Sequence, residues 1–273
     1  YYTDNECNIH IACNHPILPV ERYRNIDTAT IKILLAYNFN GRWQELLINR
    51  DMIVSKPAIY GLAKHGIDAT QQNANNLVKY FRDIENLNRA VLSEKLSVGR
   101  LGWVDDKTFV PYSKNLVFDG ENAYKVYFDS VQPCGDYGKW LAAAKEIRAG
   151  RHIQPKIMLA ASFASVLVEP LKVLSFLVHL WSASGSGYGK TVSLMLAASV
   201  WANPTPGQFI HNFSDTLVGL EKTAAFFNSL PNCIDELQTL RNKDNKNKII
   251  YMLAQGSGRT RGTRQNTALR PAG

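Results

Sequence analysis

The segment from Val173 to Trp201 places the tightest constraint on the fold, because it joins an apolar run to a helical pattern through a glycine-rich loop. The apolar run covers residues 173–180, the loop reads SASGSGYGKT at 182–191, and the helical pattern follows at 192–201. We expect a buried strand, a phosphate-binding loop and a helix, in that order. Ser184 stands where the usual P-loop motif has its first glycine, and the alternative is a Gly/Ser turn that happens to end in Lys-Thr.

The residue types in this loop suit the binding of nucleotide phosphates and Mg²⁺. Glycines let backbone N–H groups wrap the phosphates, and a helix that begins at Lys190 directs the positive end of its dipole toward them. We expect Lys190 to reach the β- and γ-phosphates as a catalytic residue and Thr191 to ligate Mg²⁺. The predicted nucleotide-binding residues are Ser184, Gly185, Ser186, Gly187, Tyr188, Gly189, Lys190 and Thr191.

A pair of adjacent acidic residues supplies the second half of such a site. Asp235 and Glu236 end a short apolar segment that starts near Leu230. We expect Asp235 to hold Mg²⁺ and Glu236 to act as the general base on the attacking water. Pro231 and Asn232 make the segment less apolar than a typical strand, and an ordinary pair of surface acids is the alternative. The loop and the acidic pair together predict a P-loop hydrolase.

Basic residues are concentrated near residue 273. The formal net charge is +8, and residues 241–273 hold eight basic residues against Asp244 alone. Such a cluster favours a polyanionic partner, because phosphates attract Lys and Arg over a Debye length of about 8–10 Å. We predict that a β-hairpin presents Arg259, Arg261 and Arg264 to a DNA backbone. The alternatives are a disordered basic loop, or one arginine that acts on the ATP of a neighbouring subunit.

Cysteine content and hydropathy favour a reducing, cytoplasmic setting. The four cysteines are too few and too scattered for a disulfide framework, and the N-terminal residues lack the pattern of a signal peptide. Residues 157–180 form the most apolar stretch, but Glu169, Pro170 and Lys172 interrupt it, which is costly at bilayer depth. We therefore expect no membrane partner.

Secondary-structure patterns divide the chain near residue 135. Before it we expect strands at 28–37 and 43–49 that form a hairpin through the turn-rich Asn38-Phe39-Asn40-Gly41. We also expect helices at 58–65 and 74–87 and further strands at 102–104, 108–111 and 116–128. After it, helical patterns at 140–147 and 156–168 lead into apolar runs that alternate with helices, which is typical of a parallel sheet covered by helices. We predict an α+β module over 1–135 and an α/β P-loop core over 136–273.

Two other groups of residues have a structural and a functional interpretation. Cys7, His10, Cys13 and His15 have the side chains of zinc ligands, but their spacing is too compressed for a standard knuckle, so we favour ordinary strand residues. The aromatic residues could stack single-stranded bases, although aromatic residues on strands more often belong to a core. They are Trp103, Tyr112, Tyr124 and Tyr127.

Five segments carry a resemblance to a known family. They are Leu62-Ala63-Lys64-His65-Gly66-Ile67, Gly102-Trp103, the 182–191 loop with Ala198-Ser199-Val200-Trp201, Ile234-Asp235-Glu236-Leu237, and Tyr251-Met252-Leu253-Ala254-Gln255-Gly256. On these segments the chain resembles domain-of-unknown-function family 927. That family occurs in prophage, plasmid and resistance-island replication proteins and is related to AAA+ replicative helicases of the MCM-like and superfamily 3 kind.

The resemblance implies an AAA+-like core that uses ATP and Mg²⁺. It assigns Lys190, Thr191, Asp235 and Glu236 to the ATP and Mg²⁺ site, and a serine-bearing loop such as the one with Ser184 is usual in the family. It also implies a ring-shaped homo-oligomer, which we predict to be a hexamer, in the cytoplasm of a bacterial cell or phage-infected host.

Some features depart from the family pattern. Gln255 stands where Asn is expected, and Arg259 stands where Lys is usual. The chain ends where the next strand of the family should begin, so we predict a core truncated before its sensor strand, which would bind ATP yet hydrolyse it poorly on its own.

The sequence thus predicts an ATP-dependent DNA helicase or translocase that acts on single-stranded or forked DNA in the replication of a mobile element. Residues 1–135 are a candidate DNA-binding module. One alternative is a nucleotide-switched DNA-binding or loader protein without unwinding activity. Another is an AAA+ remodeller in which the three arginines bind protein.

Overall fold

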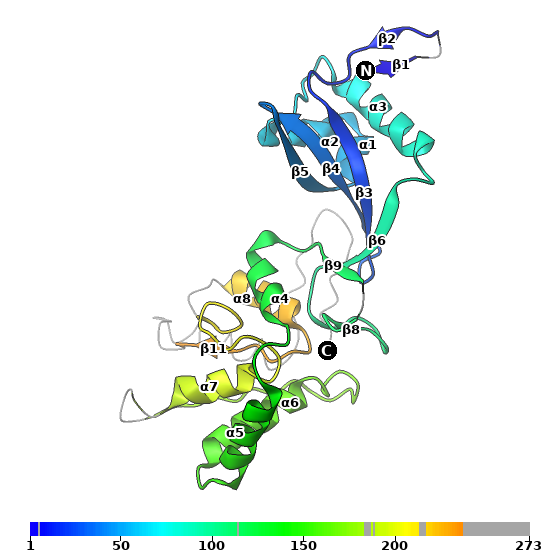
Figure 1. Cartoon of the computed structure of the whole chain (residues 1–273). Helices are drawn as coiled ribbons and strands as arrows, with labels where there is room; N and C mark the ends of the chain where they lie inside the picture. Colours follow the sequence, from blue (N-terminus) through cyan, green and yellow to red (C-terminus); the bar gives the residue numbers. More distant parts are fainter. Residues whose placement is uncertain (5, 114, 183–186, 188, 213–216, 237–273) are drawn as a thin grey trace. The chain divides into compact units, whose positions relative to one another are not determined.

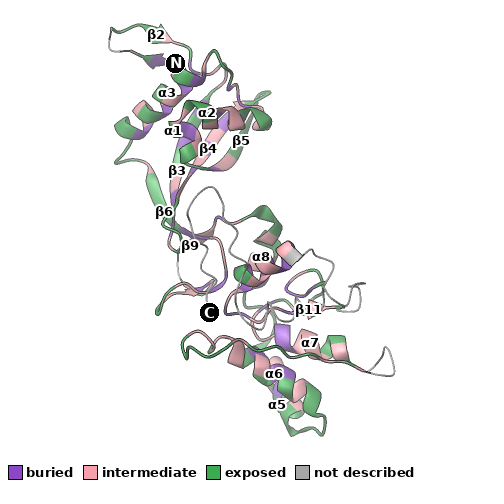
Figure 2. Cartoon of the chain, turned by 180° about the vertical axis from the view of Figure 1, so that it is seen from behind, coloured by how far each residue is buried: buried purple, intermediate pink, exposed green. Residues whose placement is uncertain are grey.

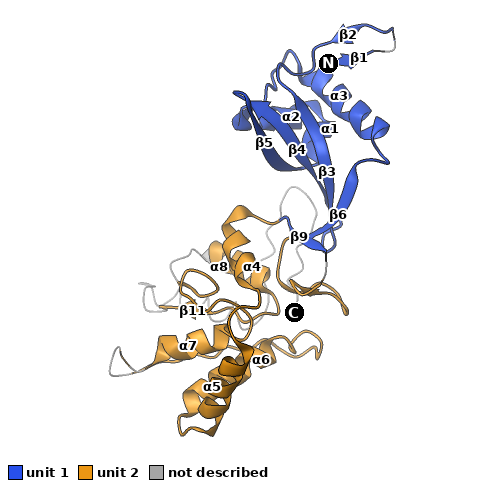
Figure 3. Cartoon of the chain, viewed as in Figure 1, with its two compact units in different colours: residues 1–98, 115–119 blue, residues 99–114, 120–273 orange. Residues whose placement is uncertain are grey.

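The computed structural model describes residues 1–4, 6–113, 115–182, 187, 189–212 and 217–236. The chain divides into two compact units (Figure 3): unit 1 comprises residues 1–98 and 115–119, and unit 2 comprises residues 99–114 and 120–273. The chain therefore passes between the units three times, after residues 98, 114 and 119. The change of secondary-structure pattern near residue 135 lies within unit 2 and does not coincide with a boundary between the two units.

Unit 1 is built on a five-stranded mixed sheet with the strand order β5-β4-β3-β6-β9. Strands β3, β4 and β5 form an antiparallel meander, and β6 and β9 continue the sheet in parallel pairs. The strands are β3 Ile17–Asn25, β4 Ile31–Phe39, β5 Arg42–Asn49, β6 Ser93–Val98 and β9 Leu116–Phe118. A small antiparallel pair, β1 Tyr2–Thr3 and β2 Ile9–His10, precedes them.

The turn between β4 and β5 confirms the hairpin that the sequence predicts. Asn40 and Gly41 have φ values of 50° and 77°, which are the positive angles that a two-residue turn with right-handed strand twist requires. Asn and Gly adopt this left-handed conformation at lower cost than other residues, because Gly has no Cβ and the Asn side chain is short and polar. The register is fixed from Phe39 opposite Arg42 to Lys32 opposite Asn49.

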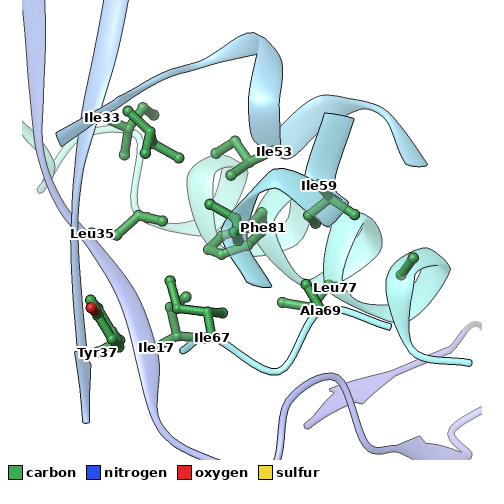
Figure 4. Packing of buried hydrophobic residues seen from close by; sticks show 13 residues of the cluster. Ile17, Ile33, Leu35, Tyr37, Ile53, Ile59, Ile67, Ala69, Leu77 and Phe81 are labelled. Atoms are coloured by element: carbon green, nitrogen blue, oxygen red, sulfur yellow. The ribbon is translucent and has the colours of Figure 1, made fainter. Parts of the chain in front are cut away.

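Helical segments cover one face of this sheet (Figure 1) and enclose the core of unit 1. They are α1 Asp51–Val54, α2 Lys56–Ile59, the 3₁₀ helix η1 Tyr60–His65 and α3 Ala74–Leu87. The predicted helix at 74–87 coincides with α3, whose buried Leu77 and Phe81 lie one turn apart on the same face. These two side chains meet Ile17, Ile33 and Leu35 of the sheet in a cluster that Figure 4 shows from close by.

Two buried carboxylates hold elements of unit 1 together. Glu85 of α3 accepts hydrogen bonds from Arg50 at 3.0 and 3.2 Å and lies 3.7 Å from Arg22 of β3. Asp119, which follows β9, accepts hydrogen bonds from Asn25 at 2.9 Å and Ser97 at 3.0 Å. Burial of a carboxylate is costly unless it is paired or hydrogen-bonded, and both groups meet that condition.

In its described residues, unit 2 contains helices and two short strand pairs. Strands β7 Gly102–Trp103 and β8 Phe109–Val110 form an antiparallel pair, and β10 His211–Asn212 and β11 Ile234–Asp235 form a parallel pair. The helices are η2 Asn122–Tyr124, α4 Lys125–Ser130, α5 Tyr137–Ala149, α6 Ile153–Ser165, α7 Lys190–Ala198 and α8 Leu217–Phe227. The described residues thus form a mixed α/β fold. Helices accompany the five-stranded sheet of unit 1 and the β10–β11 pair of unit 2, which each contain parallel strands.

Two sequence predictions about strands are wrong. The predicted strand at 116–128 stops at Phe118, and residues 122–130 are helical, because their aromatic residues pack on α8 instead of alternating across a sheet. The predicted buried strand at 173–180 is not assigned as a strand, and Leu174 is 86% exposed. An apolar run becomes a strand only where another backbone pairs with it, and no described residue pairs with 173–180.

The four aromatic residues considered for base stacking take part in packing within unit 2. Trp103 packs edge-on against Phe109 and donates from Nε1 to the carbonyl of Val166 at 2.8 Å. Tyr112 stacks on Phe109, Tyr124 stacks on Phe226, and Tyr127 contacts Phe226 and Phe227. These contacts favour packing over base stacking for Trp103, Tyr124 and Tyr127, whereas Tyr112 is 49% exposed.

Burial differs from one element to the next, as Figure 2 shows: β6 begins with exposed residues, and α5 is exposed over much of its surface. Among the described residues, none of the helices combines the length and the apolar character that a membrane crossing needs.

His10, one of the residues considered as a zinc ligand, has contacts within the β1–β2 segment. Its Nε2 lies 2.8 Å from Asp4 Oδ2, and its ring stacks on Tyr2.

Candidate functional site

Helix α7 begins at Lys190, directly after a residue with left-handed backbone geometry. Gly189 has φ 70° and Gly187 has φ 94°, and a Cβ at either position would meet no atom within 4 Å. Glycine is therefore required here by backbone conformation and not by crowding. The first turn of α7 is closed by the Ser193 N–H, which donates to Gly189 O at 2.9 Å. Lys190 and Thr191 thus stand at the positive end of the helix dipole.

The other end of α7 is anchored in unit 2. Ser162 of α6 is 1% exposed, and its hydroxyl donates to Ala197 O at 2.6 Å. The indole of Trp201 donates to Ser162 O at 3.1 Å, and the indole of Trp140 in α5 donates to Ser199 Oγ at 2.9 Å. These bonds fix α7 against α5 and α6, so the position of its N-terminus is set by the packed helices.

The carboxylate of Asp235 lies beside the start of α7. Strand β11 is paired in parallel with β10, and Asp235 is its last residue, opposite Asn212. The Thr191 hydroxyl donates to Asp235 Oδ2 at 3.1 Å, although the two residues are far apart in sequence. Asp235 Oδ1 accepts from the backbone N–H of Glu236 at 2.8 Å.

This arrangement brings hard oxygen donors together at the N-terminus of a helix. A threonine hydroxyl and a carboxylate are ligands that Mg²⁺ prefers, and backbone N–H groups at a helix start favour phosphate. Glu236 is exposed and has φ 60°, an angle that non-glycine residues seldom adopt. The residue types and their placement fit Mg²⁺ and a nucleotide phosphate.

Two residues of the segment before these carboxylates are buried, although its sequence is only partly apolar. Cys233 is 3% exposed, and burial raises the pKa of its thiol to about 12. The thiol therefore stays protonated at neutral pH and acts as a small core side chain. Leu230 is 2% exposed, which agrees with the apolar segment that the sequence predicts before Asp235.

The structure brings Thr191 and Asp235 together, and Gly189 and Lys190 directly precede Thr191 in the chain. Several predicted site residues lie outside the described residues: Ser184, Gly185, Ser186, Tyr188, Arg259, Arg261 and Arg264. Their roles stay predictions, as do those of Gly187, Gly189, Lys190, Thr191, Asp235 and Glu236.

Sequence reasoning overlooked two residues next to the carboxylates. His211 of β10 is buried, and its Nε2 lies 2.6 Å from Oδ1 of Asn232, three residues before Asp235. Asn232 is noticeable in the sequence only as a polar residue that weakens a strand pattern. A polar residue inside a short apolar segment was the one available signal of a buried hydrogen bond.

Comparison with known proteins gives a family and a structural relative. The family model described as "Domain of unknown function (DUF927)" matches residues 2–272. A solved structure described as "SCCmec type IV Cch - active helicase" aligns with a TM-score of 0.52 and 17% sequence identity. The alignment covers 89% of this chain and 47% of that chain, so this chain spans about half the length of the relative. Among curated proteins, none matches the chain.

Proposed function

The chain belongs to the DUF927 family, and from its site we propose that it binds and hydrolyses ATP as the motor of a DNA helicase or translocase in the replication of a mobile element. The observation that carries the proposal is the contact of 3.1 Å between Thr191 Oγ1 and Asp235 Oδ2. It unites the two sequence motifs that a P-loop hydrolase needs, at the start of a helix that follows a glycine-rich loop.

In this proposal each residue has a task in phosphoryl transfer to water. The N–H groups at the start of α7 and the ammonium group of Lys190 bind and orient the phosphates of ATP. Thr191 and Asp235 hold Mg²⁺, which neutralises charge on the phosphate oxygens when it is bound. Glu236 accepts a proton from the attacking water, and the products are ADP and inorganic phosphate.

The fold of the solved relative is in agreement with a helicase-like core, and the basic residues at 241–273 favour DNA as the partner. A ring of several copies, which we propose to be a hexamer, would bring the three tail arginines of each copy to the same strand. The second candidate function is a nucleotide-switched loader, which shares the site but does not separate strands.

The test is ATP hydrolysis by the natural protein with and without single-stranded DNA, in the wild type and in Lys190→Ala and Glu236→Gln. We expect DNA to stimulate turnover in the wild type and both variants to lose it by roughly 10²-fold or more, because each removes a group needed in the transition state. Glu236→Gln should still bind ATP, since the amide keeps the size of the side chain and the base acts only in the chemical step.

Two results would count against the proposal. Equal turnover in the wild type and both variants would mean that the loop is only a turn between a run of apolar residues and a helix. Hydrolysis that depends on Lys190 and Glu236 but gives no separation of a forked DNA by the natural protein would favour the loader.

A further inference from the structure

His211 is a buried polar residue of unit 2 that the proposed chemistry does not use. It is 6% exposed, its Nε2 lies 2.6 Å from Asn232 Oδ1, and its backbone N–H donates to Cys233 O at 3.1 Å. Its other ring nitrogen, Nδ1, forms no hydrogen bond with any residue that the structure describes. His211 therefore contacts the chain at two consecutive positions just before the carboxylates.

The imidazole ring of His211 also contacts two helices. It stacks on Phe227, the last residue of α8, with ring centroids 5.7 Å apart and planes at 8°. It meets Tyr127 of α4 at 5.9 Å and 62°. These aromatic contacts hold the ring in place, so the direction of its hydrogen bond to Asn232 is fixed.

Strands β10 and β11 are too short to fix their own register. They pair over two residues only, His211 opposite Ile234 and Asn212 opposite Asp235. A slip of one residue would move Asp235 by about 3.3 Å along the strand and turn its side chain to the opposite face of the pair. The contact with Thr191, which is 3.1 Å long, could not survive such a slip.

We propose that His211 is a positioning residue that, through its hydrogen bond to Asn232, keeps Asp235 in register beside Thr191. The inference rests on the proposed function, because it treats Asp235 and Thr191 as ligands of nucleotide-bound Mg²⁺. Groups behind the ligands of a metal commonly change its affinity by about 10- to 100-fold when they are removed, because they orient the ligand. The effect of His211 reaches Asp235 through the backbone of residues 232–235.

Two substitutions separate this role from simple packing. His211→Phe keeps an aromatic ring against Phe227 and Tyr127 and removes the hydrogen bond to Asn232, and it also removes the nitrogen Nδ1 that lacks a described partner. Asn232→Ala removes the other end of the same bond. His152→Phe is the matched control, because it makes the same substitution at an exposed position of unit 2.

The measurement is the affinity for Mn²⁺ in the presence of ADP, followed by electron paramagnetic resonance of free Mn²⁺, with thermal unfolding measured on the same samples. We expect His211→Phe and Asn232→Ala each to weaken Mn²⁺ binding by about tenfold. Because both remove one interaction, the double variant should be weakened no further than either single variant. His211→Phe should melt near the wild-type temperature, and His152→Phe should bind Mn²⁺ like the wild type.

The other outcomes decide separately on the positioning role of His211 and on the proposed function. Wild-type affinity in both His211→Phe and Asn232→Ala, or fully additive losses in the double variant, would exclude the positioning role and leave the proposed function standing. If the wild type itself binds no Mn²⁺ with ADP, or if Asp235→Asn binds it equally well, the proposed function fails. Should His211→Phe not fold, Asn232→Ala decides alone: a loss supports the role, and no loss excludes it.

Discussion

At the scale of single residues, Gly102 and Gly207 show how the same backbone angle can have different costs. Both have left-handed geometry, with φ 78° and 84°, and both lie in unit 2. A Cβ at Gly102 would stand 2.7 Å from the backbone N of Ser229, whereas a Cβ at Gly207 would meet no atom within 4 Å. The first site is constrained by conformation and by space, and the second by conformation alone.

Alanine at these two glycines should therefore destabilise the protein by different amounts. We expect Gly207→Ala to lower the free energy of unfolding by about 1–2 kcal/mol, which is the cost of left-handed backbone for a residue with a Cβ. Gly102→Ala should cost about 1–3 kcal/mol more, because the backbone of Ser229 must move. Chemical denaturation of both variants measures the difference, and equal losses would show that the contact with Ser229 is easily relieved.

The residues of the candidate site were predictable by type, because each phosphate-binding or Mg²⁺-binding task restricts the side chains that can perform it. Lys190, Thr191, Asp235 and Glu236 stand out in the sequence for that reason. His211 and Asn232 do not, since the one sequence signal of their hydrogen bond is a polar residue within a short apolar segment. Only the fold brings them together across β10 and β11.

At the scale of elements, Glu85 joins α3 to the sheet of unit 1. It is 6% exposed and lies against the guanidinium groups of Arg22 and Arg50. The contact with Arg50 is bidentate, which is the geometry in which guanidinium and carboxylate bind most strongly. This ionic contact lies beside the apolar cluster and fixes the helix in one orientation.

We expect Glu85→Gln to lower the free energy of unfolding by about 2–4 kcal/mol. Removal of one partner of a buried ion pair leaves the other charge without compensation, and the partial exposure of Arg50 reduces the loss below the fully buried case. The control is Asp83→Asn, which breaks the exposed Arg82–Asp83 pair and should change stability by no more than about 0.5 kcal/mol. Similar losses in both variants, measured by denaturation, would contradict the role given to Glu85.

The elements that the sequence predicts well are those with strong local signals. Helix α3 has apolar residues at helical spacing, and the β4–β5 hairpin has Asn40-Gly41 at its turn. Where partners distant in sequence decide the structure, prediction fails. The aromatic residues at 122–130 read as a strand but pack on α8 as a helix, and the apolar run at 173–180 reads as a buried strand although no described strand pairs with it.

At the scale of the whole molecule, the two units differ in charge. Unit 1 has eleven basic and eleven acidic residues and is formally neutral. Unit 2 has the remaining twenty basic and twelve acidic residues, so the whole excess of +8 belongs to it. The net positive charge that would favour a phosphate backbone therefore lies in unit 2, and the net charge of unit 1 does not support the prediction that it binds DNA on its own.

This division predicts which substitutions change the salt dependence of DNA binding. Replacement of Arg259, Arg261 and Arg264 by Ala should make the slope of log affinity against log salt shallower by about 2 for single-stranded DNA, because three phosphate contacts are lost. A second triple variant, Lys56→Ala, Lys64→Ala and Arg89→Ala, removes three exposed charges of unit 1 and should leave the slope unchanged.

The comparison of the two triple variants also tests the other interpretations. An unchanged slope in the arginine variant would favour the view that these residues bind protein. A shallower slope in the unit 1 variant would show that both units contact the DNA backbone.

The chain passes between the units three times, and this limits where recombination can join unit 1 to another protein. Residues 115–119 return to unit 1 after residues 99–114 have left it, and Asp119 then accepts hydrogen bonds from Asn25 and Ser97. A recombination event that joined residues 1–98 to a foreign partner would remove β9 and leave both donors buried without their acceptor. Unit 1 is inherited as a structural whole only when the exchanged segment extends through residue 119.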